Sequence, residues 1–287
     1  MSQHLIPDHT DIEFRNWTYS LISEREKRIS ELCKAQDWYA AWFRRWIIEL
    51  KEEPRFHRKQ WEFIFILQAL WERNCLQAGK KGLAFAVGSE PLPSLMANYG
   101  VDILATDIFP AEGMKKGWTN GNQLCFGTSS LNIRGLAEPE VFNKHVRYLP
   151  VDMNSIPDEL QGFDFNWSSC SFEHLGSLYK GKEFLKHQIK TLRPGGWAVH
   201  TTEYNLTSED KTLETGDTVI FRRRDMEEIA ESLKREGHYV EPFDFSMGGL
   251  PEDFMVDVLP HEQKVHLKLQ INEFVVTSIG IIIRKKT

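Results

Sequence analysis

Three carboxylates occur at comparable places in the chain, each at or just after the end of a short apolar run. Glu90 lies in AFAVGSEPLP, Asp107 ends ILATD, and Asp152 follows YLPV. Carboxylates accept hydrogen bonds from hydroxyl and amino groups and attract cations. Taken alone, each of these residues is more often a helix or turn cap than a ligand-binding group. Because the three follow consecutive runs, together they favour a nucleoside-binding site.

The turn that contains Gly88 has the features of a site for a cationic ligand. Gly88 has no Cβ and so lets a ligand approach the backbone closely. Glu90 adds a carboxylate to the same turn, which would repel a diphosphate and attract an amino or sulfonium group. An aminoacyl-nucleoside such as S-adenosylmethionine (SAM) is therefore favoured over NAD. A nicotinamide-dependent oxidoreductase is the weaker alternative.

The next two carboxylates fit the sugar and the base of such a nucleoside. Asp107 lies nineteen residues after Gly88, a spacing at which an acidic residue accepts hydrogen bonds from both ribose hydroxyls. Asp152 could accept a hydrogen bond from an adenine amino group, and Met153 could pack on the adenine ring. We therefore expect a nucleoside site at the carboxyl ends of successive strands.

Short apolar runs alternate with amphipathic stretches after residue 80, which is typical of strands that alternate with helices. The pattern predicts an α/β fold with a Rossmann-like, mainly parallel seven-stranded sheet and helices on both faces. Right-handed crossovers place a ligand crevice at the carboxyl ends of such strands. The last run follows no clear crossover helix, so we expect it to be antiparallel. The expected strands span residues 82–87, 103–108, 146–151, 163–170, 197–202, 239–245 and 274–284, and the expected helices include residues 92–99, 182–192 and 224–236.

The N-terminal segment has a different residue pattern, which predicts helices over residues 11 to about 78. Trp38, Trp42 and Trp46 recur every four residues and give one broad apolar face, which ends before Pro54. Aromatic residues at helical spacing more often pack in a core than bind a ligand. We expect this face to dock on the rest of the chain or, in a homodimer, on a second subunit.

Two longer motifs carry a family resemblance. FDFNWSSCSFEHL has the form of a strand and the turn after it, and LRPGGWAVHTTEYN has the form of the next strand. Together with the turn that contains Gly88 and Glu90, these segments resemble the class I SAM-dependent methyltransferase superfamily over about residues 82–245. The segment GSEPLP resembles the turn of a bacterial subgroup that is associated with sugar and natural-product modification.

The resemblance implies a domain organisation, a cofactor and its contacts. Residues 1–80 would form a helical segment, and residues 81–287 the methyltransferase domain, with SAM as the cofactor. The implied acceptor is a small molecule or a glycosyl group, with oxygen as the nucleophile. The implied SAM contacts are Gly88, Glu90, Asp107, Ile108, Asp152, Met153, Ser169 and Cys170.

Candidates for catalysis follow the fourth and fifth expected strands. Methyl transfer from a sulfonium is an in-line displacement, and a hydroxyl acceptor must also lose a proton. Histidine is a common general base in enzymes, so His174 could act as one, although a local structural role fits its position equally well. Glu203 could contact the acceptor. His200 and Glu203 are three residues apart on a strand and should face opposite sides, which argues against a metal site shared with His174.

The composition restricts the partners of the protein. A net charge of -6 and a pI near 6.0 provide no general basic field for nucleic acid. The four cysteines form no CxxC pair, which predicts reduced thiols and no zinc site. The N-terminus lacks the pattern of a signal peptide, and the apolar stretch 63–71 is shorter than the roughly 20 residues that span a bilayer. We therefore expect a soluble, cytoplasmic protein that binds neither nucleic acid nor membrane.

Two features leave alternatives open. The glycine positions of the family turn fall on Ala86, Gly88 and Glu90, so two of the three are changed. This change motivates an alternative in which the chain is a non-catalytic SAM-fold module that binds a partner protein through its tryptophan-rich helices. Residues 110–138 and 248–269 are long connections, which are either surface excursions or loops that shape the acceptor pocket.

Overall fold

The computed structural model describes residues 27–115, 124–125 and 127–287. Within these residues, eleven strands form one mixed sheet. Its main path runs in the order β4 (Val146–Pro150), β3 (Asp102–Asp107), β2 (Lys81–Phe85), β5 (Phe163–Ser169), β6 (Leu192–Asn205), β11 (Phe274–Arg284), β1 (Ser30–Leu32) and β8 (Phe243–Asp244). The short strands β7 (Tyr239–Val240), β9 (Val256–Asp257) and β10 (Lys268–Ile271) pair off this path. The predicted Rossmann-like fold is confirmed, with more strands than the seven expected.

The strand directions are those that the sequence predicts. β4, β3, β2, β5 and β6 each run parallel to their neighbours, so their carboxyl ends meet at one edge of the sheet. β11 is antiparallel to β6 from Val276↔Asn205 to Arg284↔Trp197, as expected for the last apolar run. The expected strand over residues 239–245 instead divides into β7 and β8, which pair with β11 and β1.

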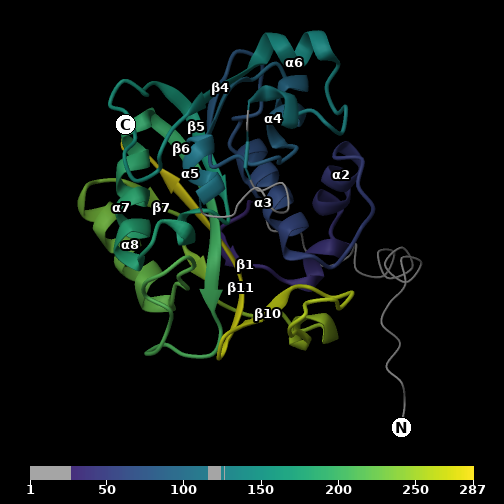
Figure 1. Cartoon of the computed structure of the whole chain (residues 1–287), viewed down its shortest axis with the longest axis vertical. Helices are drawn as coiled ribbons and strands as arrows, with labels where there is room; N and C mark the ends of the chain where they lie inside the picture. The colour runs from purple at the N-terminus through teal and green to yellow at the C-terminus, as the bar shows by residue number, and fades with distance from the viewer. Residues whose placement is uncertain (1–26, 116–123, 126) are drawn as a thin grey trace.

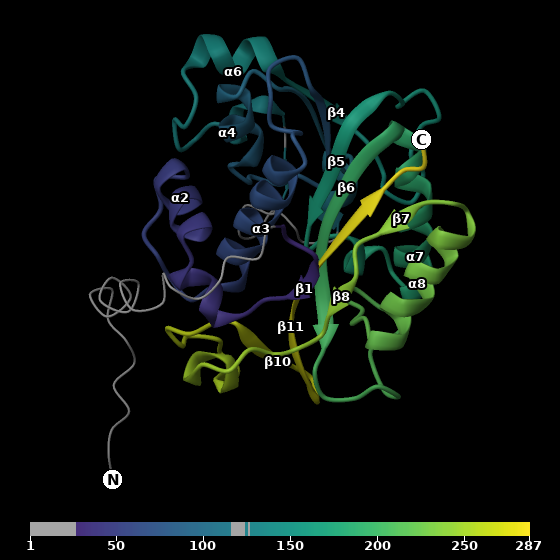
Figure 2. The same ribbon diagram turned by 180° about the vertical axis from the view of Figure 1, so that it is seen from behind.

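Helices cover both faces of the sheet, and a hydrophobic core lies under each layer. The first layer contains α2 (Ala41–Glu49), α3 (Arg58–Glu72), α4 (Leu92–Asn98) and α6 (Pro139–His145) (Figure 1). The second layer contains α7 (Leu178–His187) and α8 (Arg223–Arg235) (Figure 2). The three predicted helices correspond to α4, α7 and α8. α7 begins earlier than predicted because the Ser177 hydroxyl caps it, accepting a hydrogen bond from the Lys180 N–H at 3.2 Å.

The N-terminal segment is not purely helical, so the prediction for residues 11–78 is wrong in part. Residues 11–26 lie outside the described residues. β1 pairs antiparallel with β11 through Glu31↔Gly280 and Leu32↔Ile279. A strand forms here because it satisfies backbone groups along the edge of β11 that would otherwise be unpaired. The division into two domains at residue 80 stays a prediction, and this segment contributes a strand to the central sheet.

Three tryptophans of the same segment pack inward, whereas Trp42 is partly buried against the same core and Trp71 is 42% exposed. Trp38, Trp46 and Trp61 are buried, and each indole N–H donates a 2.7 Å hydrogen bond within the segment. α3 packs across β5, β6 and β11. The expectation that these residues form a packing surface is confirmed, and the surface docks on the same chain. Dimerisation through these helices stays a prediction.

The two long connections contain little regular structure in their described parts. Residues 110–138 begin with α5 (Pro110–Lys115), and a portion of this connection lies outside the described residues. Residues 248–269 contain the 3-10 turn η5 (Pro251–Phe254) and β9. None of the helices in the described part of the chain combines the length and the apolarity needed to cross a bilayer.

The close docking of α3 on the sheet requires a glycine at position 280. A Cβ at Gly280 would lie 2.1 Å from Cε1 of Phe65, which is buried in the core of α3 and the sheet. Gly280→Ala should therefore lower the free energy of unfolding by about 1–3 kcal/mol, because the overpacked core must shift. Gly249→Ala is the control, since no atom lies within 4 Å of a Cβ placed there. Urea unfolding that gave equal stabilities for the two variants would contradict this docking.

Candidate functional site

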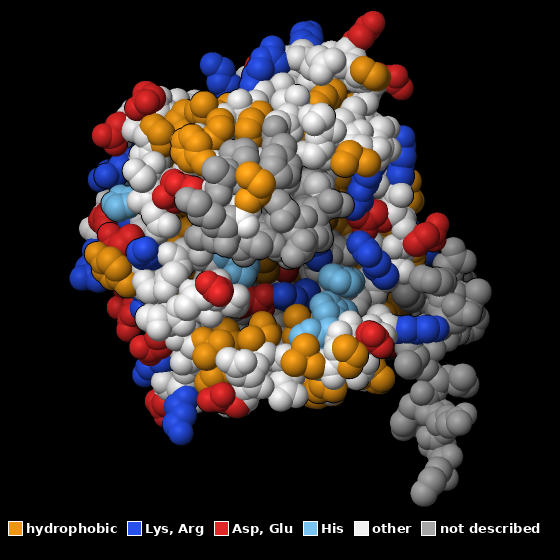
Figure 3. All heavy atoms as spheres, viewed as in Figure 1, with side chains coloured by type: hydrophobic (Ala, Val, Ile, Leu, Met, Phe, Trp, Pro, Cys, Tyr) orange, Lys and Arg blue, Asp and Glu red, His pale blue; other side chains and the backbone are white. Residues whose placement is uncertain are grey.

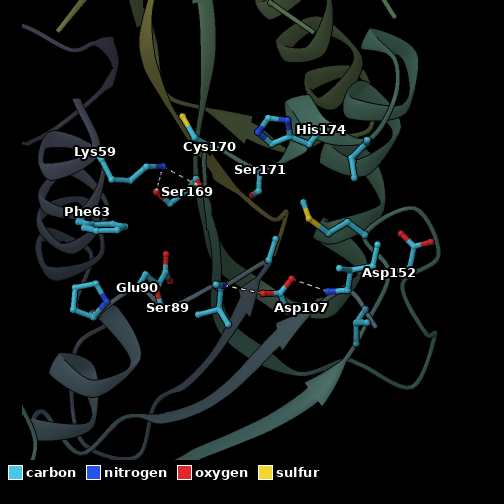
Figure 4. A pocket seen from close by; sticks show the side chains of 18 of the residues that line it. Lys59, Phe63, Ser89, Glu90, Asp107, Asp152, Ser169, Cys170, Ser171 and His174 are labelled. Carbon is cyan, nitrogen blue, oxygen red and sulfur yellow. Dashed lines mark hydrogen bonds between the residues drawn. The ribbon is translucent and has the colours of Figure 1, made fainter. Parts of the chain in front are cut away.

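A pocket of about 400 Å³ opens at the carboxyl ends of the parallel strands (Figure 4). Its volume lies within the range of about 300–1,000 Å³ that is typical of sites for small ligands and cofactors. The structure brings all eight predicted cofactor contacts to its walls. They are Gly88, Glu90, Asp107, Ile108, Asp152, Met153, Ser169 and Cys170. His174 also lines the pocket, whereas Glu203 is not among the lining residues.

The turn after β2 has a backbone that favours glycine at two positions. Ala86 has a φ of 49° and Gly88 a φ of 51°, both in the left-handed region. A Cβ in this region costs roughly 1–2 kcal/mol, so Ala86 is strained. Ala86 stands where the resembling family has its first glycine. The turn therefore keeps the glycine conformation although the residue has changed.

Asp107 connects three segments at the floor of the pocket. Its carboxylate accepts hydrogen bonds from the N–H groups of Gly88 at 2.9 Å, Ile108 at 2.8 Å and Cys125 at 3.0 Å (Figure 4). Burial raises the pKa of this carboxyl group, and the three N–H donors oppose the rise. Asp107 thus shapes the turn and also borders the pocket, where its remaining lone pairs can accept hydroxyl groups.

Glu90 brings a carboxyl group into the pocket wall. Its side chain accepts a 2.6 Å hydrogen bond from Trp167 Nε1, and the residue is only 7% exposed. Burial raises the pKa of Glu90 to about 8, against the opposing effects of the Trp167 hydrogen bond and the Lys59 charge. An entering cation would stabilise the ionised form and lower this pKa again. The position is therefore suited to an ammonium group.

The loop after β4 forms the opposite end of the pocket, and Figure 4 shows Asp152 across the pocket from Lys59 and Phe63. Asp152 Oδ1 accepts a 2.8 Å hydrogen bond from the Asn154 N–H, which fixes the loop as an Asx turn. Met153 is buried beside it and supplies an apolar surface. This end of the pocket can hold a flat ring with an amino group on its edge.

Helix α3 supplies a wall of the pocket with residues that the sequence prediction did not name. Lys59 and Phe63 line the pocket one helical turn apart. Lys59 Nζ lies 2.5 Å from Glu62 Oε2 and donates to Ser169 Oγ at 3.5 Å. The ammonium group of Lys59 is thereby held between α3 and the end of β5.

Three of the lining residues that sequence reasoning missed are basic. Figure 3 shows Lys, Arg and His side chains grouped in a hollow of this face. A signal was available for α3, where Glu62 interrupts an apolar run three residues after Lys59. A charge in such a run is buried only if it is paired, so it indicates a buried polar contact. The connection 110–138, which the sequence leaves open as a surface excursion or a pocket loop, brings Arg134 to the pocket. The missed residues include Arg55, Lys59, Phe63 and Arg134.

His174 lies at the edge of the pocket with 35% of its side chain exposed. Its Nδ1 is 2.8 Å from the carbonyl oxygen of Asp217. A carbonyl can only accept, so Nδ1 carries the proton and Nε2 is the acceptor in the neutral ring. Nε2 lies 3.9 Å from Glu173 Oε1. The hydrogen bond to the Asp217 carbonyl therefore favours the tautomer with the proton on Nδ1. In this tautomer Nε2 can accept a proton, as a general base must.

Glu203 is buried and is not among the residues that line the pocket. It forms a 2.5 Å ion pair with Arg58 Nη2, because this position of β6 faces α3. His200 projects to the other face, where its Nδ1 lies 2.8 Å from Ser168 Oγ and burial lowers its pKa to about 3. The two residues face opposite sides, as the sequence spacing predicts. A direct contact of Glu203 with an acceptor stays a prediction.

No protein-family model and no curated protein matches the sequence, whereas several solved methyltransferases resemble the chain. A proposed sarcosine dimethylglycine methyltransferase from Galdieria sulphuraria is 17% identical, with a TM-score of 0.49 over 79% of this chain and 84% of its own. The methyltransferase domain of bacterial CtHen1 is 14% identical, with a TM-score of 0.47 over 79% and 100%. Magnesium protoporphyrin IX methyltransferase from Synechocystis PCC 6803, solved with S-adenosylhomocysteine, is 10% identical, with a TM-score of 0.43 over 85% and 94%. At these identities and TM-scores, the likenesses assign no site residue, cofactor or substrate to this chain.

Glu90→Gln tests the buried carboxyl group through the pH dependence of stability. The folded-state pKa is about 8, whereas an unfolded glutamate titrates near 4.3, so the native state binds this proton more tightly. The stability that the bound proton provides is complete below pH ~4.3 and is lost as the pH rises through ~8. A glutamine at position 90 has no proton to lose, so Glu90→Gln should not show this fall in stability. Its unfolding free energy relative to the wild type should therefore increase by up to about 1.4 kcal/mol per pH unit across this window.

Chemical unfolding at several pH values between ~5 and ~8 measures this difference. Glu231→Gln is the matched control, because Glu231 is exposed on α8. Its stability should run parallel to that of the wild type. A parallel profile for Glu90→Gln as well would show that Glu90 is ionised in the native state and would refute the account of its burial.

Proposed function

We propose that this chain is a SAM-dependent methyltransferase that transfers a methyl group to the oxygen of a small-molecule or glycosyl acceptor. One observation carries the proposal: a single pocket contains Glu90 in the turn after β2, Asp107 at the end of β3 and Asp152 after β4. An ammonium group, a ribose and an adenine need these three acceptors in this order. A dinucleotide would place a diphosphate at the turn of Glu90, where a carboxylate is unfavourable.

The walls of the pocket provide a partner for each part of SAM. Asp107 would accept the ribose hydroxyls, while Asp152 and Met153 would contact the adenine. Glu90 would bind the α-ammonium group, and Lys59 would pair with the α-carboxylate beside Ser169. When bound, SAM supplies a methyl group on a sulfonium, which is the electrophile.

The acceptor would enter between α3 and the turn after β5. In-line displacement requires the nucleophile to be held collinear with the methyl group and the sulfur, and Phe63 and Cys170 would form the walls that restrict it. His174 Nε2 would take the proton of an acceptor hydroxyl, since Nδ1 is already committed to the Asp217 carbonyl. Exclusion of water by these walls would favour transfer to the acceptor over hydrolysis.

The alternative of a non-catalytic module has less support. Trp38, Trp46 and Trp61 are buried against the same chain and do not offer a surface for a partner. The turn at Ala86 and Gly88 keeps the conformation that a glycine-rich turn requires. The changed residues that motivate this alternative therefore leave the pocket intact.

Calorimetric titration with S-adenosylhomocysteine tests the cofactor. The wild type should bind it saturably, with a dissociation constant of roughly micromolar order. Asp107→Ala should weaken binding by about 10- to 100-fold, because hydrogen bonds to a charged group contribute about 1.5–3 kcal/mol. Asp210→Ala is the control, since Asp210 is exposed and lies outside the pocket residues.

Two outcomes would contradict the proposal. Unchanged affinity in Asp107→Ala would remove the site assignment, and saturable binding of NADH in place of S-adenosylhomocysteine would favour an oxidoreductase. Transfer of a labelled methyl group from SAM to a panel of sugars and hydroxylated metabolites then tests the reaction itself. Tight binding without any transfer would favour the non-catalytic module.

A further inference from the structure

A second group of buried polar side chains lies beside the pocket, between α3 and the ends of β5 and β6. Cys170 follows β5, Glu173 lies in the 3-10 turn η3 (Phe172–His174), and Glu203 lies on β6. Each brings one potential ligand atom to within 4.8 Å of the other two. Glu173 is 0% exposed and Glu203 is 4% exposed, so this is not an ordinary surface cluster of acidic residues.

Each of the two glutamates has one oxygen that is held by a neighbour and one that is not. Glu173 Oε2 accepts a 2.9 Å hydrogen bond from Thr202 Oγ1, and Glu203 Oε1 lies 2.5 Å from Arg58 Nη2. Within the described residues, Glu173 Oε1 and Glu203 Oε2 make no hydrogen bond. Buried acceptors are rarely left in this state, because they have lost water without gaining a partner. Two buried glutamates with an unsatisfied oxygen each, in one cluster, point to a further group that binds there.

The charges around the cluster indicate the sign of that group. The two cationic side chains of α3 next to the cluster are paired with Glu62 and Glu203. Glu203 is already paired with Arg58. A thiolate at Cys170 and a carboxylate at Glu173 would add two negative charges, which one divalent cation balances.

We propose that Cys170, Glu173 and Glu203 bind one divalent transition-metal ion of the zinc type. A thiolate and two carboxylates are ligands that Zn²⁺ accepts, and three protein ligands leave the fourth position of a tetrahedron open. Cys170 and His174 both line the pocket, so the ion would border the space for the acceptor. His174 Nε2, the base proposed for the acceptor hydroxyl, lies 3.9 Å from Glu173 Oε1 and so borders the cluster.

The proposed site differs from the prediction that the chain has no metal site. That prediction considered CxxC pairs and the residue His200, which faces the other side of the sheet. Cys170 and Glu173 become neighbours of Glu203 only because β5 pairs with β6. The inference concerns ion binding alone and does not rest on the proposed methyl transfer. In that reaction the ion would bind the acceptor hydroxyl and lower its pKa.

The experiment uses the full-length chain after dialysis against a chelator. The chain is then titrated with Co²⁺. This ion is used in place of Zn²⁺ because its thiolate complexes absorb in the near ultraviolet. One ion per chain and a thiolate-to-cobalt absorption band are expected. Cys170→Ser should abolish the band and weaken Co²⁺ binding by about tenfold or more. Glu203→Gln should weaken binding to a similar extent.

Cys75→Ser is the matched control, because Cys75 is buried in the loop after α3 and outside the cluster. It should keep the band and the affinity. Serine at position 170 can still donate to Glu62, as the Cys170 thiol does at 2.9 Å, so this variant should fold. Absence of stoichiometric binding, or an equal band in Cys170→Ser, would overturn the proposal. Titration of the same samples with S-adenosylhomocysteine is an independent measurement, so failure of the metal site and failure of the cofactor site are distinguishable.

Discussion

The buried carboxylate of Glu62 holds α3 against the sheet, and one wall of the pocket depends on this contact. It accepts hydrogen bonds from Ser278 Oγ at 2.5 Å and from Cys170 Sγ at 2.9 Å, and it pairs with Lys59 Nζ at 2.5 Å. Burial opposes ionisation, but the charges of Lys59 and Arg58 lower the pKa of Glu62 to about 2. The charge therefore persists at neutral pH and ties α3, β5 and β11 together beside the acceptor space.

Asp107 has the corresponding role on the other side of the pocket, where its carboxylate joins the turn after β2 to the connection after β3. Both carboxylates are buried and both are satisfied by donors from separate segments, which is the condition under which a buried charge is tolerated. Glu90 lies in the wall between them, holds its proton and has one hydrogen-bond donor. The carboxylates of Glu62 and Asp107 are thus fixed by their hydrogen-bond donors. The carboxyl group of Glu90 would lose its proton when a cation binds beside it.

The sequence predicted those parts of the structure that local patterns determine. The run 274–284 became β11 with the predicted bounds and direction, and the carboxylates after successive strands lie in one pocket. The sequence could not predict contacts that exist only across the fold. The three residues of β1 form a strand only because β11 offers an edge, and Glu203 turns toward Arg58 of a helix distant in the chain. Ala86 is a similar case, since its left-handed backbone is set by the turn rather than by its residue type.

A crystal structure of the chain with S-adenosylhomocysteine would show how a nucleoside lies in the pocket. Adenine should lie beside Met153, the ribose hydroxyls at Asp107 and the α-ammonium group at Glu90, with the sulfur directed toward the space between Phe63 and His174. The backbone of the turn should be unchanged, because Asp107 already holds it. A nucleoside bound in the reverse direction, or bound elsewhere on the chain, would contradict the account.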